Sequence, residues 1–330
     1  MNPPPPTSPP DPPAQRIALI VNPRATGATA TARSRIARQL AGAPVEWDLV
    51  TRTPADTGAL AEQAVREGAN VVVSLGGDGT ASDIAASLAG GPALYVPLPG
   101  GNANVFSRAL GWPARMDAAV DALVAALRRP VGRTIRLGAI ACDERAPRPF
   151  IINCGIGLDA ETVAWIEAHP RVKRRLRHTG FALAALLAAR GARGAPPLRV
   201  WTSDRPDGDE PPAESLEVAL LIATCGRPYT YFHDRPIDLL PDADFSGRLR
   251  WLGVHRFRPG HLAALGIRAL RQRPQPDDDN LVGGPIDGWL RVSAPEARAV
   301  QADGEPLGSH REMAIGPGPS LETLVPRTPS

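Results

Sequence analysis

The chain has very few of the residues on which several common folds and sites depend. Among its 330 residues there are three cysteines, and Cys142, Cys154 and Cys225 lie far apart with no CxxC spacing. A disulfide framework and a zinc site are therefore not expected, and buried free thiols in a reducing compartment are the simpler interpretation. Because no run of about 18 apolar residues occurs, the sequence predicts no membrane-spanning helix.

Lysine is almost absent, because Lys173 is the only one in the chain. P-loop NTPases and protein kinases both place a lysine on the nucleotide phosphates. Lys173 stands among arginines with no glycine-rich loop beside it. If the chain binds a nucleotide, it must therefore use a different set of groups to hold the phosphates.

The net charge and the N-terminal sequence indicate which partners and which cellular location to expect. The formal net charge is only +3, and no basic stripe with interleaved aromatic residues occurs, so no nucleic-acid partner is expected. An anionic substrate or membrane surface is compatible with this charge. The N-terminus lacks the basic start and apolar stretch of a signal peptide. We therefore expect a cytoplasmic protein, with the inner face of the membrane as a possible site of peripheral contact.

The pattern of apolar runs divides the chain into two parts. Residues 1–15 are rich in proline and are expected to form a disordered tail. Over residues 16–132, strand and helix patterns alternate, which predicts an α/β domain with an open, largely parallel sheet. The expected strands of this domain are 17–21, 47–50, 71–75 and 94–98, and the expected helices are 31–40, 56–67 and 80–88.

After residue 132 the pattern changes to strands with few helices between them. We therefore predict a mainly β domain over residues 133–315, followed by a C-terminal segment over 316–330. The expected strands of this part are 135–140, 150–153, 198–202, 216–224, 249–254 and 289–292.

A glycine-rich turn follows the third predicted strand and opens a helix. It consists of Gly76, Gly77, Asp78, Gly79 and Thr80. Glycines let the backbone approach a phosphate, and the N–H groups and dipole at a helix N-terminus favour an anion. Asp78 is a candidate ligand of a phosphate-bridging metal ion, and Thr80 is a candidate phosphate contact. An ordinary tight strand–helix turn is the competing interpretation.

Two further polar turns follow other predicted strands. One contains Asn22 and Pro23, and the other contains Asn102 and Asn104. Because the carboxyl ends of parallel strands meet at one edge of a sheet, the three turns are expected to line one crevice. The sequence therefore predicts a nucleotide-sized site made of backbone amides and small side chains, without a lysine.

Together these segments resemble the diacylglycerol kinase catalytic-domain family, which includes the YegS- and BmrU-like lipid kinases of bacteria. The glycine-rich turn alone is also typical of NAD kinases. Residues 104–111, with the pattern N-x-F-x-R-x-L-G, are more typical of the lipid kinases. Residues 153–160 (NCGIGLDA) and 300–305 (VQADGE) also resemble motifs of the family.

The resemblance implies an ATP- and Mg²⁺-dependent kinase that phosphorylates a lipid hydroxyl. The active site would lie in a cleft between the α/β domain and a β-sandwich-like second domain. Thr51 and the Asn22–Pro23 turn would complete the ATP site, and Asp303 or Glu305 would take the proton from the lipid hydroxyl. A simple β-turn is the competing interpretation of Asp303 and the glycine after it.

The chain departs from the family in two places. The family usually has threonine where Asn102 stands. Relatives carry an acidic stretch for a second magnesium site where this chain has residues 246–250 (SGRLR), with an arginine near an expected acid. Asp242 and Asp244 are candidate substitutes for that acid.

Other interpretations stay open. A NAD kinase-like enzyme and a catalytically weak nucleotide- or lipid-binding protein are the alternatives to a lipid kinase that acts on a diacylglycerol-like acceptor. The basic cluster at 171–177, followed by the apolar run 181–189, predicts either contact with an anionic membrane or a helix with a solvated basic end. Exposed sheet edges in the β part would allow a homodimer.

Overall fold

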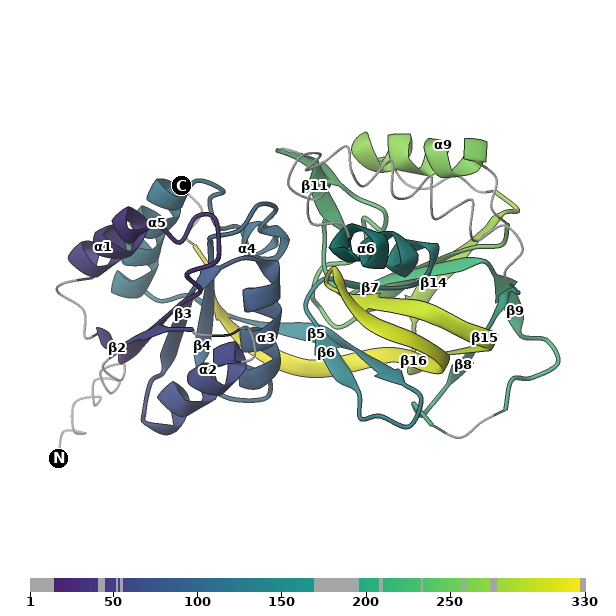
Figure 1. Ribbon diagram of the computed structural model, residues 1–330, viewed down its shortest axis with the longest axis horizontal. Helices are drawn as coiled ribbons and strands as arrows, with labels where there is room; N and C mark the ends of the chain where they lie inside the picture. Colours follow the sequence, from purple (N-terminus) through teal and green to yellow (C-terminus); the bar gives the residue numbers. More distant parts are fainter. Residues whose placement is uncertain are drawn as a thin grey trace, which may run out of the picture.

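The computed structural model describes residues 15–40, 45–51, 53, 56–168, 196–207, 210–232, 234–256, 259–273 and 278–326. It confirms the predicted combination of an open, largely parallel α/β sheet with a mainly β second part (Figure 1). The basic cluster at 171–177 and the apolar run at 181–189 lie outside the described residues.

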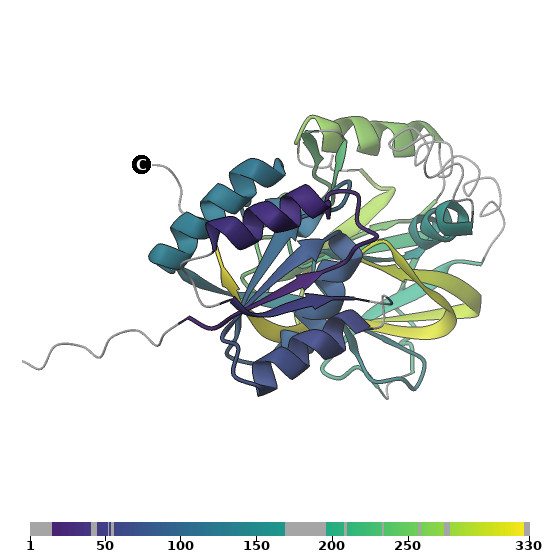
Figure 2. The same cartoon turned by 60° about the vertical axis from the view of Figure 1, so that its left-hand side comes forward.

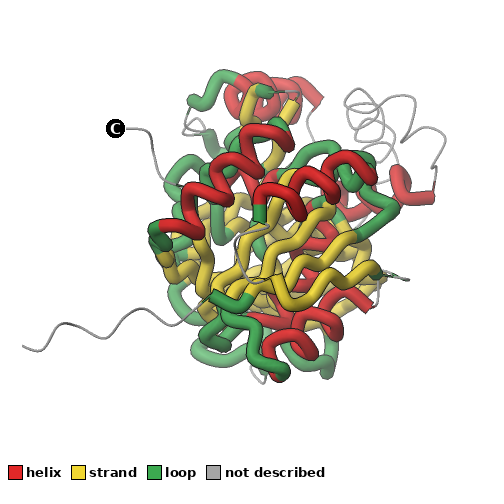
Figure 3. The backbone as a smooth tube through the Cα atoms, turned by 90° about the vertical axis from the view of Figure 1, so that its left-hand side faces the viewer, coloured by secondary structure: helices red, strands yellow, loops and turns green. Residues whose placement is uncertain are grey.

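The first part alternates strands and helices as its apolar runs predict. Its elements are β1 (Ile17–Val21), α1 (Ala30–Gln39), β2 (Val45–Val50), α2 (Asp56–Arg66), β3 (Val71–Gly76), α3 (Asp78–Leu88), β4 (Leu94–Pro99), α4 (Val105–Ala109) and α5 (Met116–Arg128). The parallel strands lie in the order β4-β3-β1-β2. Strands β1 and β3 are buried along their whole length, as expected where helices cover both faces of a parallel sheet. Helices α1 and α5 lie on one face, and α2 and α3 on the other (Figures 2 and 3).

The second part is built mainly from antiparallel pairs. Its elements are β5 (Gly132–Cys142), β6 (Arg148–Phe150), β7 (Asn153–Gly157), α6 (Leu158–Ala168), β8 (Leu198–Ser203), β9 (Leu216–Val218), β10 (Leu220–Thr224), β11 (Thr230–Phe232), β12 (Arg235–Ile237), β13 (Leu249–Val254), α9 (Pro259–Leu270), β14 (Leu281–Ile286), β15 (Trp289–Ala302) and β16 (Glu305–Leu324). Strand β7 lies between β10 and β15, at the centre of the sheet. As expected, the three cysteines are free and buried.

Strand β16 connects the two parts. It pairs with β15 and β5 in the second part, and near its end Thr323 pairs with Tyr95 of β4 in parallel. In Figure 1 it is the long yellow strand that runs from one part into the other. The sheet is therefore continuous through the molecule, and β16 crosses residue 315. The domain boundaries proposed from the sequence stay predictions.

Several predicted strands have different limits in the structure. The run expected at 150–153 is the end of β6 and the start of β7, and the run expected at 216–224 is divided at Ala219. The division has a structural cause, because β9 pairs with β8, whereas β10 pairs with β7 and β13. The strand expected at 289–292 continues to Ala302 as β15. The elements that were not predicted are α4, α5, α6, α9, β11, β12, β14 and β16.

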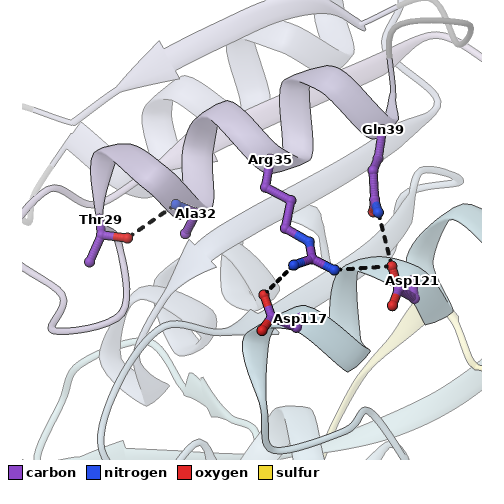
Figure 4. A network of polar contacts seen from close by, with 6 residues as sticks. All are labelled: Thr29, Ala32, Arg35, Gln39, Asp117 and Asp121. Carbon is purple, nitrogen blue, oxygen red and sulfur yellow. Dashed lines mark hydrogen bonds and ion pairs between the residues drawn. The ribbon is translucent and has the colours of Figure 1, made fainter.

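Polar contacts fix helix α1 on α5 at the outer face of the first part (Figure 4). The hydroxyl of Thr29 caps α1 by accepting an N–H of its first turn. Arg35 forms ion pairs with Asp117 at 2.7 Å and Asp121 at 3.6 Å, and Gln39 donates to Asp121 at 2.9 Å. These contacts hold the helix that directly follows the turn with Asn22.

Candidate active site

The three polar turns that were predicted to share a sheet edge are in direct contact. The Asn22 side-chain amide donates to the Thr80 hydroxyl at 2.9 Å. The backbone N–H of Gly27 donates to the carbonyl of Gly100 at 2.7 Å, and the N–H of Gly100 donates to the carbonyl of Gly76 at 2.8 Å. The structure therefore brings the ends of β1, β3 and β4 together at one edge.

Close approach between two of these turns requires glycine. A Cβ atom at Gly100 would lie 2.7 Å from the backbone nitrogen of Gly76, and one at Gly101 would lie 2.6 Å from the Cα of Gly77. These glycines are explained by packing of turn on turn. Gly79 differs, because a Cβ atom there would lie 3.0 Å from the Glu305 carboxylate. The glycine-rich turn therefore faces the second part of the molecule at Gly79.

The N-terminus of α3 is the part of this edge that suits an anion. Gly77 is the N-cap residue and provides no side-chain cap. The first N–H groups of a helix have no acceptor within the helix, and the helix dipole adds positive potential there. The hydroxyl of Thr80 is buried and accepts a hydrogen bond from Asn22. The backbone N–H groups are donors placed for a phosphate, and the role of Thr80 as a phosphate contact stays a prediction.

Asp78 points toward helix α4. One of its carboxylate oxygens, Oδ1, accepts the N–H of Phe106 at 3.1 Å, so Asp78 caps that helix. Desolvation raises the pKa of Asp78 to about 6, against the opposing effect of the N–H groups at the start of α4, and the nearby Asp303 carboxylate adds to the rise. Its role as a metal ligand stays a prediction.

Asn104 and Asn102 occupy different positions in the third turn. Asn104 is buried with φ 49°, and its side-chain amide accepts from the N–H of Gly101 at 2.7 Å and donates to the Gly101 carbonyl at 2.9 Å. Asn104 therefore shapes its own turn. Asn102 is exposed, and its side-chain oxygen accepts from the Thr26 hydroxyl at 3.4 Å. It stands free to contact a ligand.

The two remaining residues predicted for the nucleotide site lie at the ends of β1 and β2. Pro23 is exposed in the turn after β1. Thr51 is buried directly after β2, and its N–H donates to the carbonyl of Val21 at 3.0 Å. Both belong to the same sheet edge as the glycine-rich turn.

The Asp-Gly-Glu segment forms the tight turn between β15 and β16. Asp303 and Gly304 both have positive φ, 51° and 81°, as in a type I′ hairpin turn. The competing interpretation as a β-turn is therefore correct for the backbone. The turn also reaches the first part of the molecule, because the Ser82 hydroxyl in α3 donates to Asp303 Oδ2 at 2.8 Å.

The Asp303 carboxylate accepts four hydrogen bonds. Besides Ser82, the donors are the backbone N–H groups of Ile151 and Ile152, each at 2.8 Å, and of Asn153 at 3.2 Å. Desolvation raises the pKa of Asp303, and these hydrogen bonds oppose the rise. The carboxylate is thus held rigidly beside the N-terminal turns of α3.

Glu305 lies closer to solvent, in a cluster of charges. Its Oε2 atom is 2.8 Å from a guanidinium nitrogen of Arg148, and both side chains are about two-fifths exposed. The pKa of Asp83 is raised to about 6, first by desolvation and then by the charge of Glu305, with Arg148 acting in the opposite direction. A carboxylate whose ionised form is disfavoured by a neighbouring carboxylate lies in an environment suited to a cation. Sequence reasoning missed Arg148, which belongs to none of the motifs.

Comparison with known proteins agrees with this arrangement. Residues 16–134 match the diacylglycerol kinase catalytic domain. Over these residues the chain therefore has a domain of the diacylglycerol kinase catalytic-domain family. A probable lipid kinase, YegS-like, of Pseudomonas fluorescens is 42% identical over 92 residues, which are 26% of this chain and 29% of the relative. An uncharacterized protein of Synechocystis sp. is 30% identical over 129 residues, which are 39% of this chain and 27% of the relative. The matches thus span less than a third of both curated relatives.

Solved structures share the fold over nearly the whole chain. The crystal structure of a diacylglycerol kinase from Bacillus anthracis superposes with a TM-score of 0.63 at 18% identity, and covers 94% of this chain and 97% of its own. A second structure from the same organism gives a TM-score of 0.67 at 21% identity, with coverage of 94% and 95%. None of the helices in the described part of this chain has the length and hydropathy to cross a membrane.

A polar network in the second part of the molecule supports the Asp303 turn. Gln301 donates to Asp159 at 2.7 Å and accepts the N–H of Gly304 at 2.8 Å. The Tyr229 hydroxyl donates to Asp159 as well. Sequence reasoning assigned no role to Gln301 or Asp159, although both stand inside the motifs 300–305 and 153–160. Their presence in those motifs was the available signal.

Arg108 joins α4 to the hairpin of β11 and β12. Its guanidinium carbon lies 3.4 Å from the centre of the Tyr231 ring, and one guanidinium nitrogen lies 3.7 Å from the Asp234 carboxylate. This arginine belongs to the 104–111 motif typical of the lipid kinases. It makes a second contact between the two parts of the molecule.

The stretch that replaces the family's second magnesium site is held by ion pairing. Asp242 forms an ion pair with Arg250 at 2.8 Å. Asp244 accepts the N–H of Ser246, and hydrogen bonding from Ser246 lowers the pKa of Asp244. Within the described ranges, no group of three or more histidine, cysteine or acidic side chains is placed to hold a metal ion.

Proposed function

We propose that this chain is a lipid kinase that transfers the γ-phosphoryl group of ATP to a hydroxyl of a diacylglycerol-like lipid. The observation that carries the proposal is the 2.8 Å hydrogen bond from Ser82 to Asp303. It places the candidate proton acceptor of the second part against the N-terminal turns of α3, where phosphates would bind. The match of residues 16–134 to the diacylglycerol kinase catalytic domain supports the same chemistry.

ATP and Mg²⁺ fit the groups that line this edge. The open N–H groups at the start of α3 suit the phosphates, and Asn102 is exposed beside them. Mg²⁺ commonly binds one or two protein carboxylates together with substrate phosphates, so the paired acids Asp83 and Glu305 are the candidate ligands besides Asp78. When bound, Mg²⁺ neutralises phosphate charge during transfer.

Asp303 is our candidate for the group that accepts the lipid proton. Its pKa is raised by desolvation, which makes it a better base than an exposed carboxylate. Three of its four donors are backbone N–H groups that are fixed in place, whereas the Ser82 hydroxyl is free to rotate away. The position of the Ser82 hydroxyl is therefore where a lipid hydroxyl would donate. The lipid oxygen would then attack the γ-phosphorus as ADP leaves.

The decisive experiment is transfer of labelled γ-phosphate from ATP to a mixed lipid extract with Mg²⁺. Wild type should label a lipid, and Asp303→Asn should not. Glu305→Gln should retain lipid binding but transfer phosphate slowly. It removes a candidate Mg²⁺ ligand near the glycine-rich turn and leaves Asp303 in place. The chromatographic mobility of the labelled product would begin to identify the acceptor among diacylglycerol, phosphatidylglycerol, sphingoid bases and polyprenols.

The same assay separates the alternatives. If wild type labels no lipid but labels NAD, the chain is a NAD kinase-like enzyme. If ATP binds and neither acceptor is labelled, the chain is a nucleotide-binding protein without turnover. Either outcome would overturn the proposed lipid kinase activity.

A further inference from the structure

Large exposed apolar side chains gather around a groove in the second part. Phe232 in β11 is 37% exposed, and Ile267 and Leu270 in α9 are 50% and 40% exposed. They line a groove of about 470 Å³ between the hairpin and α9, together with Asp234, Arg235 and Arg271. We call the five residues Phe232, Arg235, Ile267, Leu270 and Arg271 the docking face. The groove is separate from the sheet edge that holds the glycine-rich turn.

Helix α9 has apolar side chains on two sides. Leu265 and Ala269 are buried in the molecule, whereas Ile267 and Leu270 point to solvent. A surface helix of a globular protein normally presents polar residues on its outer side. The exposed parts of Ile267 and Leu270 therefore leave an apolar surface on the outer side of α9.

Cations border this apolar surface. Arg235 and Arg271 are exposed, and within the described ranges neither forms an ion pair. The acidic residue of the groove, Asp234, lies 3.7 Å from Arg108 on the side of the first part. The docking face thus combines apolar side chains that can enter an acyl boundary with arginines placed for anionic headgroups.

The position of the hairpin relates this surface to the site. Arg108 holds Tyr231 and Asp234 against α4, which directly follows the turn with Asn102 and Asn104. The hairpin that borders the docking face is thus in contact with the first part of the molecule, at the helix that follows one of the three turns of the candidate site.

We propose that the docking face binds the surface of an anionic lipid bilayer and so presents the membrane to the active site. Its apolar residues enter the interface, and its arginines contact the headgroups. The relevance to catalysis rests on the proposed lipid kinase function, whereas the binding itself does not.

Sedimentation of the full chain with lipid vesicles tests this proposal without ATP. The vesicles contain phosphatidylcholine alone or phosphatidylcholine with phosphatidylglycerol. Wild type should bind the anionic vesicles, and the double variant Ile267→Ser with Leu270→Ser should bind them about tenfold more weakly, because it removes the apolar contact. Leu216→Ser is the matched control, since Leu216 is 42% exposed in β9, outside the groove. It should bind like wild type.

A second double variant, Arg235→Ser with Arg271→Ser, tests the charge independently of the apolar residues. It should lose most of the preference for anionic over neutral vesicles while its thermal unfolding stays unchanged. Wild-type vesicle binding by both double variants would overturn the proposal, as would no binding by wild type. A dimer in wild type that the Ile267 and Leu270 double variant abolishes would assign this surface to a second copy of the chain instead.

Kinase assays distinguish failure of this proposal from failure of the proposed function. If docking is correct and the chain is a lipid kinase, the Ile267 and Leu270 double variant should phosphorylate a dispersed short-chain diacylglycerol at the wild-type rate and a vesicle-embedded one about tenfold more slowly. If wild type phosphorylates neither lipid but vesicle binding depends on the docking face, only the kinase proposal fails. Equal rates for both proteins on vesicles would contradict docking.

Discussion

Asp78 and Asp303 are partly buried carboxylates from the two parts of the molecule, and their hydrogen-bond partners come from different distances along the chain. Asp78 accepts the N–H of Phe106 in α4, the helix that follows the neighbouring strand of the same α/β sheet. Asp303 accepts N–H groups from residues 151–153 and the hydroxyl of Ser82, which is 221 positions away. The first carboxylate organises one part, whereas the second joins both.

The difference indicates which kind of mutation should disrupt each side of the site. The α/β side of the site is made of backbone turns that pack against each other. Steric clashes therefore decide which substitutions it tolerates. The side with Asp303 is made of hydrogen bonds that converge on one charged group, so loss of that charge leaves several donors without an acceptor. Each carboxylate also affects the other, since the charge of Asp303 contributes to the raised pKa of Asp78.

The largest effect should come from Asp303→Asn. An amide offers one acceptor oxygen in place of two, so it leaves some of the four donors without a partner and removes the candidate base. We expect the rate of lipid phosphorylation to fall at least ~100-fold and the free energy of unfolding to fall by about 1–3 kcal/mol. Initial rates and urea unfolding measure the two effects.

Ser82→Ala is the matched control for this change. It removes the one side-chain donor and leaves the carboxylate with its three backbone partners, so a loss of about 1 kcal/mol or less is expected. Wild-type phosphorylation by Asp303→Asn would remove Asp303 from the mechanism and leave Glu305 as the candidate base.

The steric side of the comparison is tested by Gly100→Ala. The added Cβ would lie 2.7 Å from the nitrogen and 2.9 Å from the carbonyl oxygen of Gly76. Because both atoms belong to a neighbouring turn, relief requires backbone movement, and a loss of about 1–3 kcal/mol is expected. The free energy of unfolding, measured in urea, and the affinity for ATP should both decrease.

Gly266→Ala in α9 is the control, because nothing lies within 4 Å of its added Cβ. Alanine should stabilise that helix by about 0.5–1 kcal/mol. Equal stability changes in the two glycine variants would show that the turns adapt, contrary to the steric account.

A smaller effect is expected from pH at the outer carboxylates. The pKa of Asp83 is raised from 3.8 to about 6, so the folded state binds this proton more tightly than the unfolded state does. Asp83 therefore makes stability decrease as pH rises between those two values, and stability is regained as pH falls. If Asp83 holds Mg²⁺ as proposed, phosphoryl transfer should instead increase as pH rises through about 6, because the ionised acid is the form that binds the cation.

Asp83→Asn separates these two trends. The unfolding temperature should depend less on pH over the same interval, while Asp78 retains its own raised pKa of about 6. A series of thermal unfolding curves across this interval measures the slope. An unchanged slope in the variant would assign the pH dependence to other groups.

The α/β part was predictable because its signals are local. The buried strands β1 and β3 are continuous apolar runs, and polar turns follow them directly. The place where three such turns meet follows from the geometry of parallel sheets. The glycine-rich turn was expected after the strand at 71–75, and it does follow β3. In the third turn, close packing against Gly76 and Gly77 explains Gly100 and Gly101.

The β part was less predictable because its strands are irregular and its contacts are distant in sequence. Strand β16 contains Pro306 and Pro317, which are typical of turns, and its pairing register shifts between Pro317 and Ser320. Bulges let such residues stay within a strand. The partners of Asp303 at residues 151–153 are set by the order of strands, which no local pattern reveals.

The smallest effect should come from Arg35→Met. It changes the outer face of the α/β part and leaves the three turns of the candidate site unchanged. Arg35 pairs with Asp117 and Asp121, but both acids are more than half exposed, so solvent weakens the attraction. The Nε atom of Arg35 is also buried without an acceptor, and methionine removes that cost. We expect a loss of about 0.5–1 kcal/mol, and salt should reduce the difference from wild type. Arg66→Met, which breaks a more exposed pair with Glu62, should cost less. A loss of ATP-binding free energy larger than the loss of unfolding free energy would instead show that α1 positions the Asn22 turn. The α/β side of the candidate site would then depend on side-chain contacts, as the side with Asp303 does.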